Sequence, residues 1–111
     1  MANIVKKSLD RPDEVKTLEK MKMEIVSLEG FRVQRETAEP GWRWSKHVKP
    51  VVGGESCRNH HLIHVLAGRI RVRMDDGQEE EFGPGDVGII PPGHDGWNIG
   101  DEPVVWIEIP H

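Results

Sequence analysis

Short stretches of alternating apolar and polar residues run along most of this chain, and turn-forming residues separate them. In residues 31–38, Phe31, Val33 and Arg35 alternate with Arg32 and Gln34, and a period of two residues is typical of a strand. We expect further strands, bounded by Gly, Pro and Asp, at 23–28, 57–66, 69–74, 78–82, 87–91, 94–99 and 103–109. Eight or nine short strands with turns between them predict a β-sandwich or β-barrel.

Residues 69–82 predict a hairpin with one apolar face and one charged face, because aliphatic residues alternate with three arginines in its first strand. A three-residue turn at 75–77 with Gly77 at positive φ sets the register. This register pairs Arg73 with Glu79, Arg71 with Glu81 and Ile70 with Phe82. Acidic residues opposite the arginines favour a solvated, charge-paired face over a phosphate-binding stripe.

Two segments carry weaker strand signals. Residues 1–22 are rich in charge, and Val15, Leu18 and Met21 recur at every third position, which favours a short helical turn. We interpret 1–22 as an N-terminal arm on the barrel or on a partner subunit, and 23–111 as a single barrel domain. The segment 42–54 holds two tryptophans, a proline and two glycines, which predicts a loop or a broken strand.

Composition restricts the class of protein. A chain of 111 residues with 12 Gly and 8 Pro allows one domain with many turns. Its 15 Lys+Arg against 19 Asp+Glu include no basic block, so we expect no nucleic-acid partner. No stretch is apolar enough for a membrane span and no signal region is evident. Together with the single cysteine, Cys57, this predicts a cytoplasmic protein in a reducing compartment.

The spacing of Gly, Pro and His residues points to a family. Residue His61 is followed by Gly68, and Gly85 by 91–93, which is Pro-Pro-Gly, then by His94 and Asn98. This pattern resembles the two consensus motifs of the cupin superfamily. The segments 40–50, 74–77 and 91–97 more narrowly resemble small bacterial single-domain cupins. The resemblance implies an all-β jelly-roll β-barrel (a double-stranded β-helix) with a metal or ligand site in its mouth.

The resemblance also implies a ligand set, with the usual residue types permuted. Counting back from Gly68 places His61 where the first motif has its glutamate, and Glu55 and Cys57 where it has two histidines. In the second motif, counting back from the end of the motif selects His94 as the ligand. Counting forward from Gly93 selects Gly96 instead, which has no side chain to bind a metal.

The candidate metal ligands are therefore Cys57, His61 and His94, with Glu55 as a further possibility. A thiolate with two imidazoles resembles catalytic zinc sites, whereas two histidines with a carboxylate resemble non-haem iron sites. Zinc, iron, manganese or nickel thus remain open. The alternative for Cys57 is a small buried apolar residue. Because His60 and His61 are adjacent, a strand would direct only one of them into the barrel.

Other residues are candidates for the pocket and for acid–base chemistry. We expect Trp42, Trp44 and Trp97 at the pocket wall, against the alternative of core or dimer packing. Asp95 and His60 are the candidate catalytic groups, although a turn-capping role suits Asp95 equally well.

These patterns predict a metal-binding cupin that forms a homodimer and acts on a small organic molecule inside the barrel. Oxygenase, isomerase and lyase chemistry all remain open. The alternatives are a non-catalytic metal- or ligand-binding module, such as a sensor or storage protein, and a degenerate barrel without metal.

Overall fold

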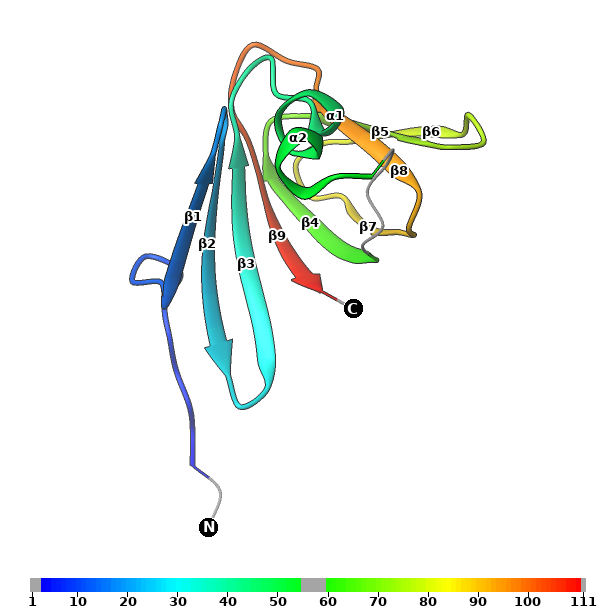
Figure 1. Ribbon diagram of the computed structural model, residues 1–111. Helices are drawn as coiled ribbons and strands as arrows, with labels where there is room; N and C mark the ends of the chain where they lie inside the picture. The colour runs from blue at the N-terminus through cyan, green and yellow to red at the C-terminus, as the bar shows by residue number, and fades with distance from the viewer. Residues whose placement is uncertain (1–2, 55–59, 111) are drawn as a thin grey trace.

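The structure, a computed structural model, describes residues 3–54 and 60–110. Strands dominate it, and two four-residue helices follow the third strand (Figure 1). The elements in chain order are β1 Glu14–Leu18, β2 Met21–Leu28, β3 Phe31–Ala38, α1 Trp44–His47, α2 Lys49–Val52, β4 His61–Ala67, β5 Ile70–Met74, β6 Glu79–Phe82, β7 Val87–Ile90, β8 His94–Asn98 and β9 Val104–Pro110.

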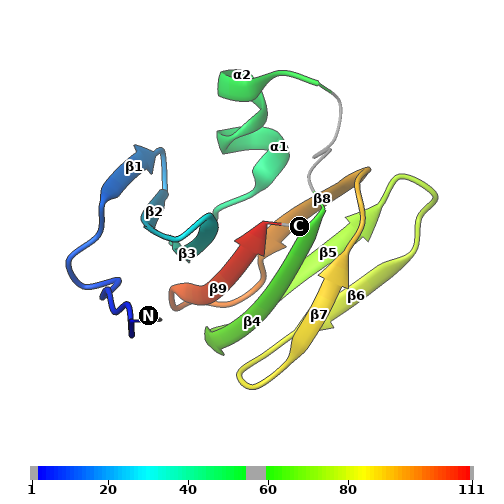
Figure 2. The same ribbon diagram turned by 90° about the horizontal axis from the view of Figure 1, so that it is seen from below.

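The strands form two antiparallel sheets, one of six strands in the order β1-β2-β3-β9-β4-β7 and one of three in the order β6-β5-β8. Seen from below, β9, β4 and β7 face β8, β5 and β6, while β1–β3 extend to one side (Figure 2). The predicted all-β fold is confirmed, and the arrangement is consistent with a jelly roll.

The hairpin of β5 and β6 has the register that the sequence predicts: Arg73 pairs with Glu79, Arg71 with Glu81 and Ile70 with Phe82. Gly77 has a φ of 96°, as the tight turn requires. The outer face is charge-paired, since Arg69 contacts Glu81 and Arg71 contacts Glu79.

Two expectations from the sequence are wrong. The third-residue spacing of Val15, Leu18 and Met21 does not produce a helical turn, because residues 14–18 instead pair with β2 along their whole length. The segment 42–54 contains helices α1 and α2 rather than a broken strand. Helix α1 is held by a residue distant in sequence: the carboxylate of Asp95 on β8 accepts a hydrogen bond from the backbone N–H of Ser45 at 3.0 Å. The boundary at residue 22 between arm and barrel stays a prediction.

The core lies between the two sheets and beneath the helices. Its most deeply buried large side chains are Val65 and Val104. Gly68 adopts a φ of 74° where β4 passes the start of β9, and a Cβ there would lie 2.5 Å from the carbonyl oxygen of Pro103. Only glycine allows the two backbones to approach this closely.

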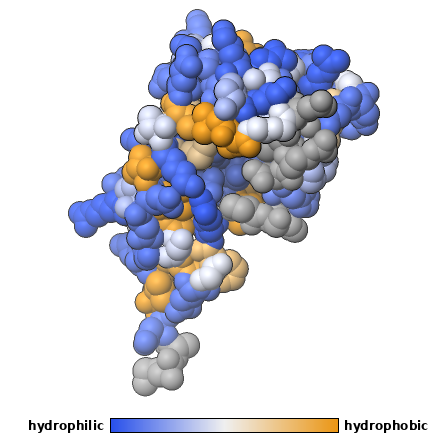
Figure 3. All heavy atoms as spheres, in the orientation of Figure 1, coloured by the Kyte–Doolittle hydropathy of each residue, from blue (hydrophilic) through white to orange (hydrophobic). Residues whose placement is uncertain are grey.

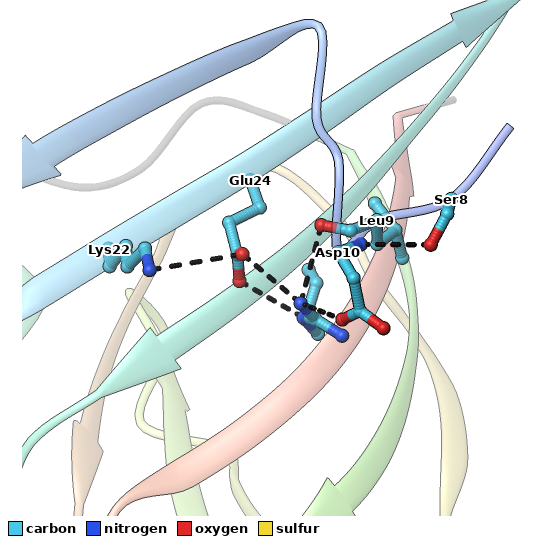
Figure 4. A network of polar contacts seen from close by, with 6 residues as sticks. Ser8, Leu9, Asp10, Lys22 and Glu24 are labelled. Carbon is cyan, nitrogen blue, oxygen red and sulfur yellow. Dashed lines mark hydrogen bonds and ion pairs between the residues drawn. The ribbon is translucent and has the colours of Figure 1, made fainter.

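A cluster of charges helps to tie the N-terminal segment to the six-stranded sheet (Figure 4). Arg35 on β3 contacts Glu24 on β2 at 3.0 Å and Asp10 at 2.9 Å, and it lowers the pKa of Glu24 through a hydrogen bond. Beyond this cluster, the side chain of Ile4 is almost fully exposed. Among the helices of the described residues, none has the length and apolar character needed to cross a membrane.

Candidate functional site

A pocket of about 920 Å³ occupies the space between β1–β3, β9, β4, β8 and the two helices. Aromatic and aliphatic side chains form much of its wall, with Trp42, Trp44 and Trp106 as the largest. Its polar lining includes Arg32, Gln34, Glu36, His60, His61, His94 and Glu108. An apolar cavity with a few converging polar groups is the usual form of a small-molecule site.

Strand register explains why the polar groups converge. Gln34 on β3, Glu108 on β9 and Ile63 on β4 are directly paired across the sheet, so their side chains share one face. Because side chains alternate along a strand, Glu36 and His61, each two residues from this row, face the same way. Gln34, Glu36 and Glu108 are all buried.

The two imidazoles of the pocket lie next to each other. The ring centroids of His61 and His94 are 5.1 Å apart in an edge-to-face arrangement. The Nδ1 of His61 lies 2.8 Å from a carboxylate oxygen of Glu108, and the Nδ1 of His94 lies 2.7 Å from the carbonyl oxygen of Pro91. A proton on each Nδ1, donated to these oxygens, places the lone pair of the neutral ring on Nε2.

Two buried carboxyl groups complete the polar part of the pocket. The indole N–H of Trp106 donates to Glu36 at 2.8 Å and, at 3.4 Å, to Glu108. Burial raises the pKa of Glu108, but hydrogen bonds with His61 and Glu36 outweigh burial and hold this pKa well below its usual value. Glu108 is therefore ionised at neutral pH. A hydrogen bond between Glu36 and Glu108 requires one shared proton.

The predicted metal ligands are partly placed by the structure. His61 and His94 meet in the pocket, whereas Glu55 and Cys57 lie outside the described residues. In residues 3–54 and 60–110, no group of three or more His, Cys, Asp or Glu is arranged to hold a metal ion. The two histidines nevertheless fit a metal, because metal-bound histidines usually donate the N–H of the other ring nitrogen to a carboxylate or a backbone carbonyl.

The alternation of side chains along β8 places two of the candidate residues, Asp95 and Trp97, outside the pocket. On β8, His94 and Gly96 line the pocket, so Asp95 and Trp97 point to the other face. Asp95 instead contacts Arg43 at 3.1 Å as it holds α1, and the Arg43 guanidinium lies 4.3 Å from the centroid of the Trp97 ring. Asp95 thus holds the start of α1, and neither Asp95 nor Trp97 is among the residues that line this pocket.

Other candidates lie at the pocket. Trp42 and Trp44 line it and also belong to the buried core, so the pocket-wall and core-packing interpretations both remain open. His60 lines it together with His61, although we expected only one of these neighbours inside. Strand β4 begins at His61, so the alternation rule does not extend to His60. The indole Nε1 of Trp42 is buried and has no hydrogen-bond acceptor among the described residues.

Sequence reasoning missed Arg32, Gln34, Glu36 and Glu108 as pocket residues. The alternation in β3 correctly separates two faces, but the face with the polar residues is the one that turns inward. For Glu108 a signal was present: it is the one charged residue in the otherwise apolar strand β9. A charge in such a strand is costly to bury unless it is paired, and it therefore marks a site.

Comparisons with known proteins agree on the fold. A family model described as "Cupin domain" matches residues 52–110. No curated protein matches the chain. A protein of unknown function from Rhizobium leguminosarum is 16% identical, with a TM-score of 0.70 and coverage of 99% of this chain and 98% of that one.

Two enzymes are also among the similar structures. A cupin-superfamily sugar phosphate isomerase from Silicibacter pomeroyi is 19% identical, with a TM-score of 0.66 and coverage of 96% and 74% of the two chains. An oxalate decarboxylase from Bacillus subtilis is 27% identical, with a TM-score of 0.63. The match covers 87% of this chain but only 27% of the decarboxylase.

Proposed function

Because this chain belongs to the cupin domain family, we propose that it is a small metal-dependent enzyme that acts on a small organic molecule inside the barrel. The observation that carries the proposal is the placement of His61 and His94 beside two buried carboxyl groups in a pocket of about 920 Å³. The similarity to an isomerase and a decarboxylase of the same fold supports an enzymatic role.

In this proposal the metal binds to Nε2 of His61 and of His94, and Cys57 or Glu55 supplies a further ligand. When bound, a divalent metal supplies a Lewis acid for a substrate oxygen atom. Zinc is favoured if the thiolate binds, and iron or manganese if the carboxylate binds.

The surrounding residues have separate tasks. Glu108 orients the His61 ring through the 2.8 Å contact at Nδ1. The proton shared by Glu36 and Glu108 is available for transfer to or from a substrate, which makes the pair a better acid–base candidate than the outward-facing Asp95. Trp42, Trp44 and Trp106 reduce the water around the reacting atoms.

Elemental analysis of protein purified without chelator tests the metal. We expect close to one divalent metal per chain, lost on His94→Ala or His61→Ala. The matched control is His64→Ala, because His64 lies on the same strand as His61 but on the opposite face of the sheet, away from the pocket. If His94→Ala fails to fold, His94→Gln keeps the volume.

Metal in less than about a tenth of the chains would refute the proposal, since an intact site binds tightly. Retention of metal by the His94 variant would show that His94 is not a metal ligand. A screen for turnover, with oxygen consumption as one readout, then separates the enzyme from its alternative. Bound metal without any product would identify a metal- or ligand-binding module.

We also propose that the chain forms a homodimer through the outer face of β9, β4 and β7. Ile109, Leu62 and Ile89 form one row across this face, and Ile107, His64 and Val87 form the next. At exposed fractions of 45%, 63%, 60% and 39%, Leu66, Val87, Ile89 and Ile109 present roughly 350 Å² of apolar surface, comparable to the largest and often functional apolar patch of a typical protein.

A second copy is the partner that suits this face best. None of its outward residues on the three strands carries a fixed charge, so the face can pair with itself across a two-fold axis. The area is about half of the roughly 800 Å² that each partner of a standard interface buries, and a polar rim supplies the rest.

Light scattering during gel filtration tests the dimer. We expect twice the chain mass of 12.6 kDa for the wild type and a monomer for Ile89→Glu. Phe31→Glu is the control, because Phe31 is exposed at the tip of the β2–β3 hairpin, away from this face. A wild-type monomer at high concentration would exclude the dimer, as would an unchanged mass for Ile89→Glu.

Figure 3 shows a different face of the molecule from the proposed dimer interface. On the face shown there, apolar residues gather along the β1–β3 part of the molecule.

A further inference from the structure

Arg32 differs from most other arginines of this protein in its partner. Arg35, Arg43, Arg69 and Arg71 each contact a carboxylate. Arg32 lines the pocket, and its Nε donates a 2.8 Å hydrogen bond to the amide oxygen of Gln34. Within the described residues it forms no ion pair with a carboxylate, and a neutral amide leaves its positive charge uncompensated.

The hydrogen bond with Gln34 also fixes the direction of the Arg32 side chain. Gln34 is itself buried, so its amide is a rigid support for the guanidinium. Because the bond uses Nε, the two terminal nitrogens form a fork on the other side. That planar fork matches the two oxygens of a carboxylate or phosphate group.

Arg32 lies at the level of the pocket histidines. Gln34, Glu108 and Ile63 form one row across β3, β9 and β4. Arg32 precedes Gln34 by two residues and His61 precedes Ile63 by two, so both lie one pleat beyond this row on the same face. Only β9 separates their strands, and two strand spacings are about 10 Å. A molecule of a few carbon atoms spans that gap between the side chains.

The buried carboxyl groups orient such a molecule. Ionised Glu108 and its neighbour Glu36 disfavour an anionic group beside them, whereas the Arg32 fork favours one. Lys16 adds a second positive charge to the pocket lining. Lys16 and Arg32 are both exposed at the open side of the pocket, and Lys16 lies 3.8 Å from Glu14.

We propose that Arg32 forms an anion-binding subsite at the β3 side of the pocket, and that the ligand is a small organic oxyanion. Its carboxylate or phosphate group contacts the Arg32 fork, while its other end reaches His61 and His94. The identification of this ligand as the substrate rests on the proposed function, whereas the subsite exists with or without metal.

Titration of metal-free protein tests the subsite independently of the metal. The probes are succinate, glycerol 3-phosphate and the neutral analogue succinamide, followed by NMR of the Arg32 Nε–H and the Gln34 side-chain amide. We expect both anions to shift these signals, and the tighter of the two identifies carboxylate or phosphate as the preferred group. Succinamide should cause no shift.

Substitutions then separate a subsite from general charge attraction. Arg32→Gln should weaken anion binding at least about tenfold, because it removes a charge-assisted bidentate contact. Arg32→Lys keeps the charge without the fork and should bind with intermediate affinity. Arg73→Gln is the matched control, since Arg73 is exposed on β5, does not line the pocket, and its removal changes the net charge equally.

Three results would overturn the subsite. The first is an equal loss of anion affinity in Arg32→Gln and Arg73→Gln, and the second is equal binding of succinamide and succinate. The third is the absence of any NMR shift at about 20 mM anion, a concentration well above a millimolar dissociation constant. Because the protein carries no metal in this experiment, a failure here is distinct from a failure to find metal in the purified protein.

Discussion

A comparison of Trp42 with Trp106 allows the contribution of one buried hydrogen bond, from the Trp106 indole to Glu36, to the free energy of unfolding to be measured. The two rings are 5.9 Å apart and are buried to the same degree, with 4% and 5% of their surface exposed. The indole N–H of Trp106 donates to Glu36 at 2.8 Å, whereas that of Trp42 has no acceptor among the described residues. Replacing each ring with phenylalanine removes the same atoms from both positions.

The expected free energies of unfolding follow from this difference. Both variants lose apolar contacts and leave a small cavity, at a similar cost of about 1–2 kcal/mol. Trp106→Phe also loses the hydrogen bond to Glu36 and leaves that buried carboxyl group without one of its donors. This loss adds about 1.5–3 kcal/mol to the destabilisation. Trp42→Phe loses no such bond to any of the described residues. We therefore expect Trp106→Phe to be less stable than Trp42→Phe by about 1.5–3 kcal/mol.

Urea unfolding of metal-free protein, followed by circular dichroism, measures this difference without a contribution from bound ligand. The slopes of the two transitions should agree, so that the midpoints report stability alone. A difference below about 0.5 kcal/mol, or a less stable Trp42→Phe, would refute the assignment of the bond to Glu36.

Two further predictions concern the frame of the barrel. Gly68→Ala should destabilise the protein by about 1–3 kcal/mol more than Gly77→Ala. Alanine must adopt a positive φ at both positions, but only the Cβ at position 68 would collide with backbone atoms. Thermal unfolding measures the two losses of stability, and equal losses would contradict the prediction. The hydrogen bond from Arg35 lowers the pKa of Glu24 below its usual 4.5, so the unfolded state binds more protons near that pH. Stability from this pair is thus present above pH 4.5 and is lost as the pH falls through the folded-state pKa. In acid titrations monitored by urea unfolding, Glu24→Gln should flatten this dependence and the exposed control Glu39→Gln should not; equal slopes for wild type and Glu24→Gln would contradict the linkage.

Local sequence patterns are sufficient to predict the structure where neighbours in sequence are also neighbours in space. The β5–β6 hairpin follows its predicted register because alternation and a short glycine turn leave one pairing that buries the apolar face. Helix α1 is different, because the carboxylate of Asp95, fifty residues along the chain from Ser45, accepts its N–H. No local signal in 42–54 contains that information.

The sequence by itself determined the class of fold and the hairpin register, since turn residues and a period of two residues act over short distances. The resemblance to the cupin motifs, and not the local pattern, pointed to His61 and His94. Only the tertiary structure decided which face of β3, β8 and β9 turns inward. That choice brings Arg32, Glu36 and Glu108 into the pocket and turns Asp95 away from it. It depends on pairing between strands that are far apart in the chain, such as β3 with β9, and therefore on contacts that no local pattern records.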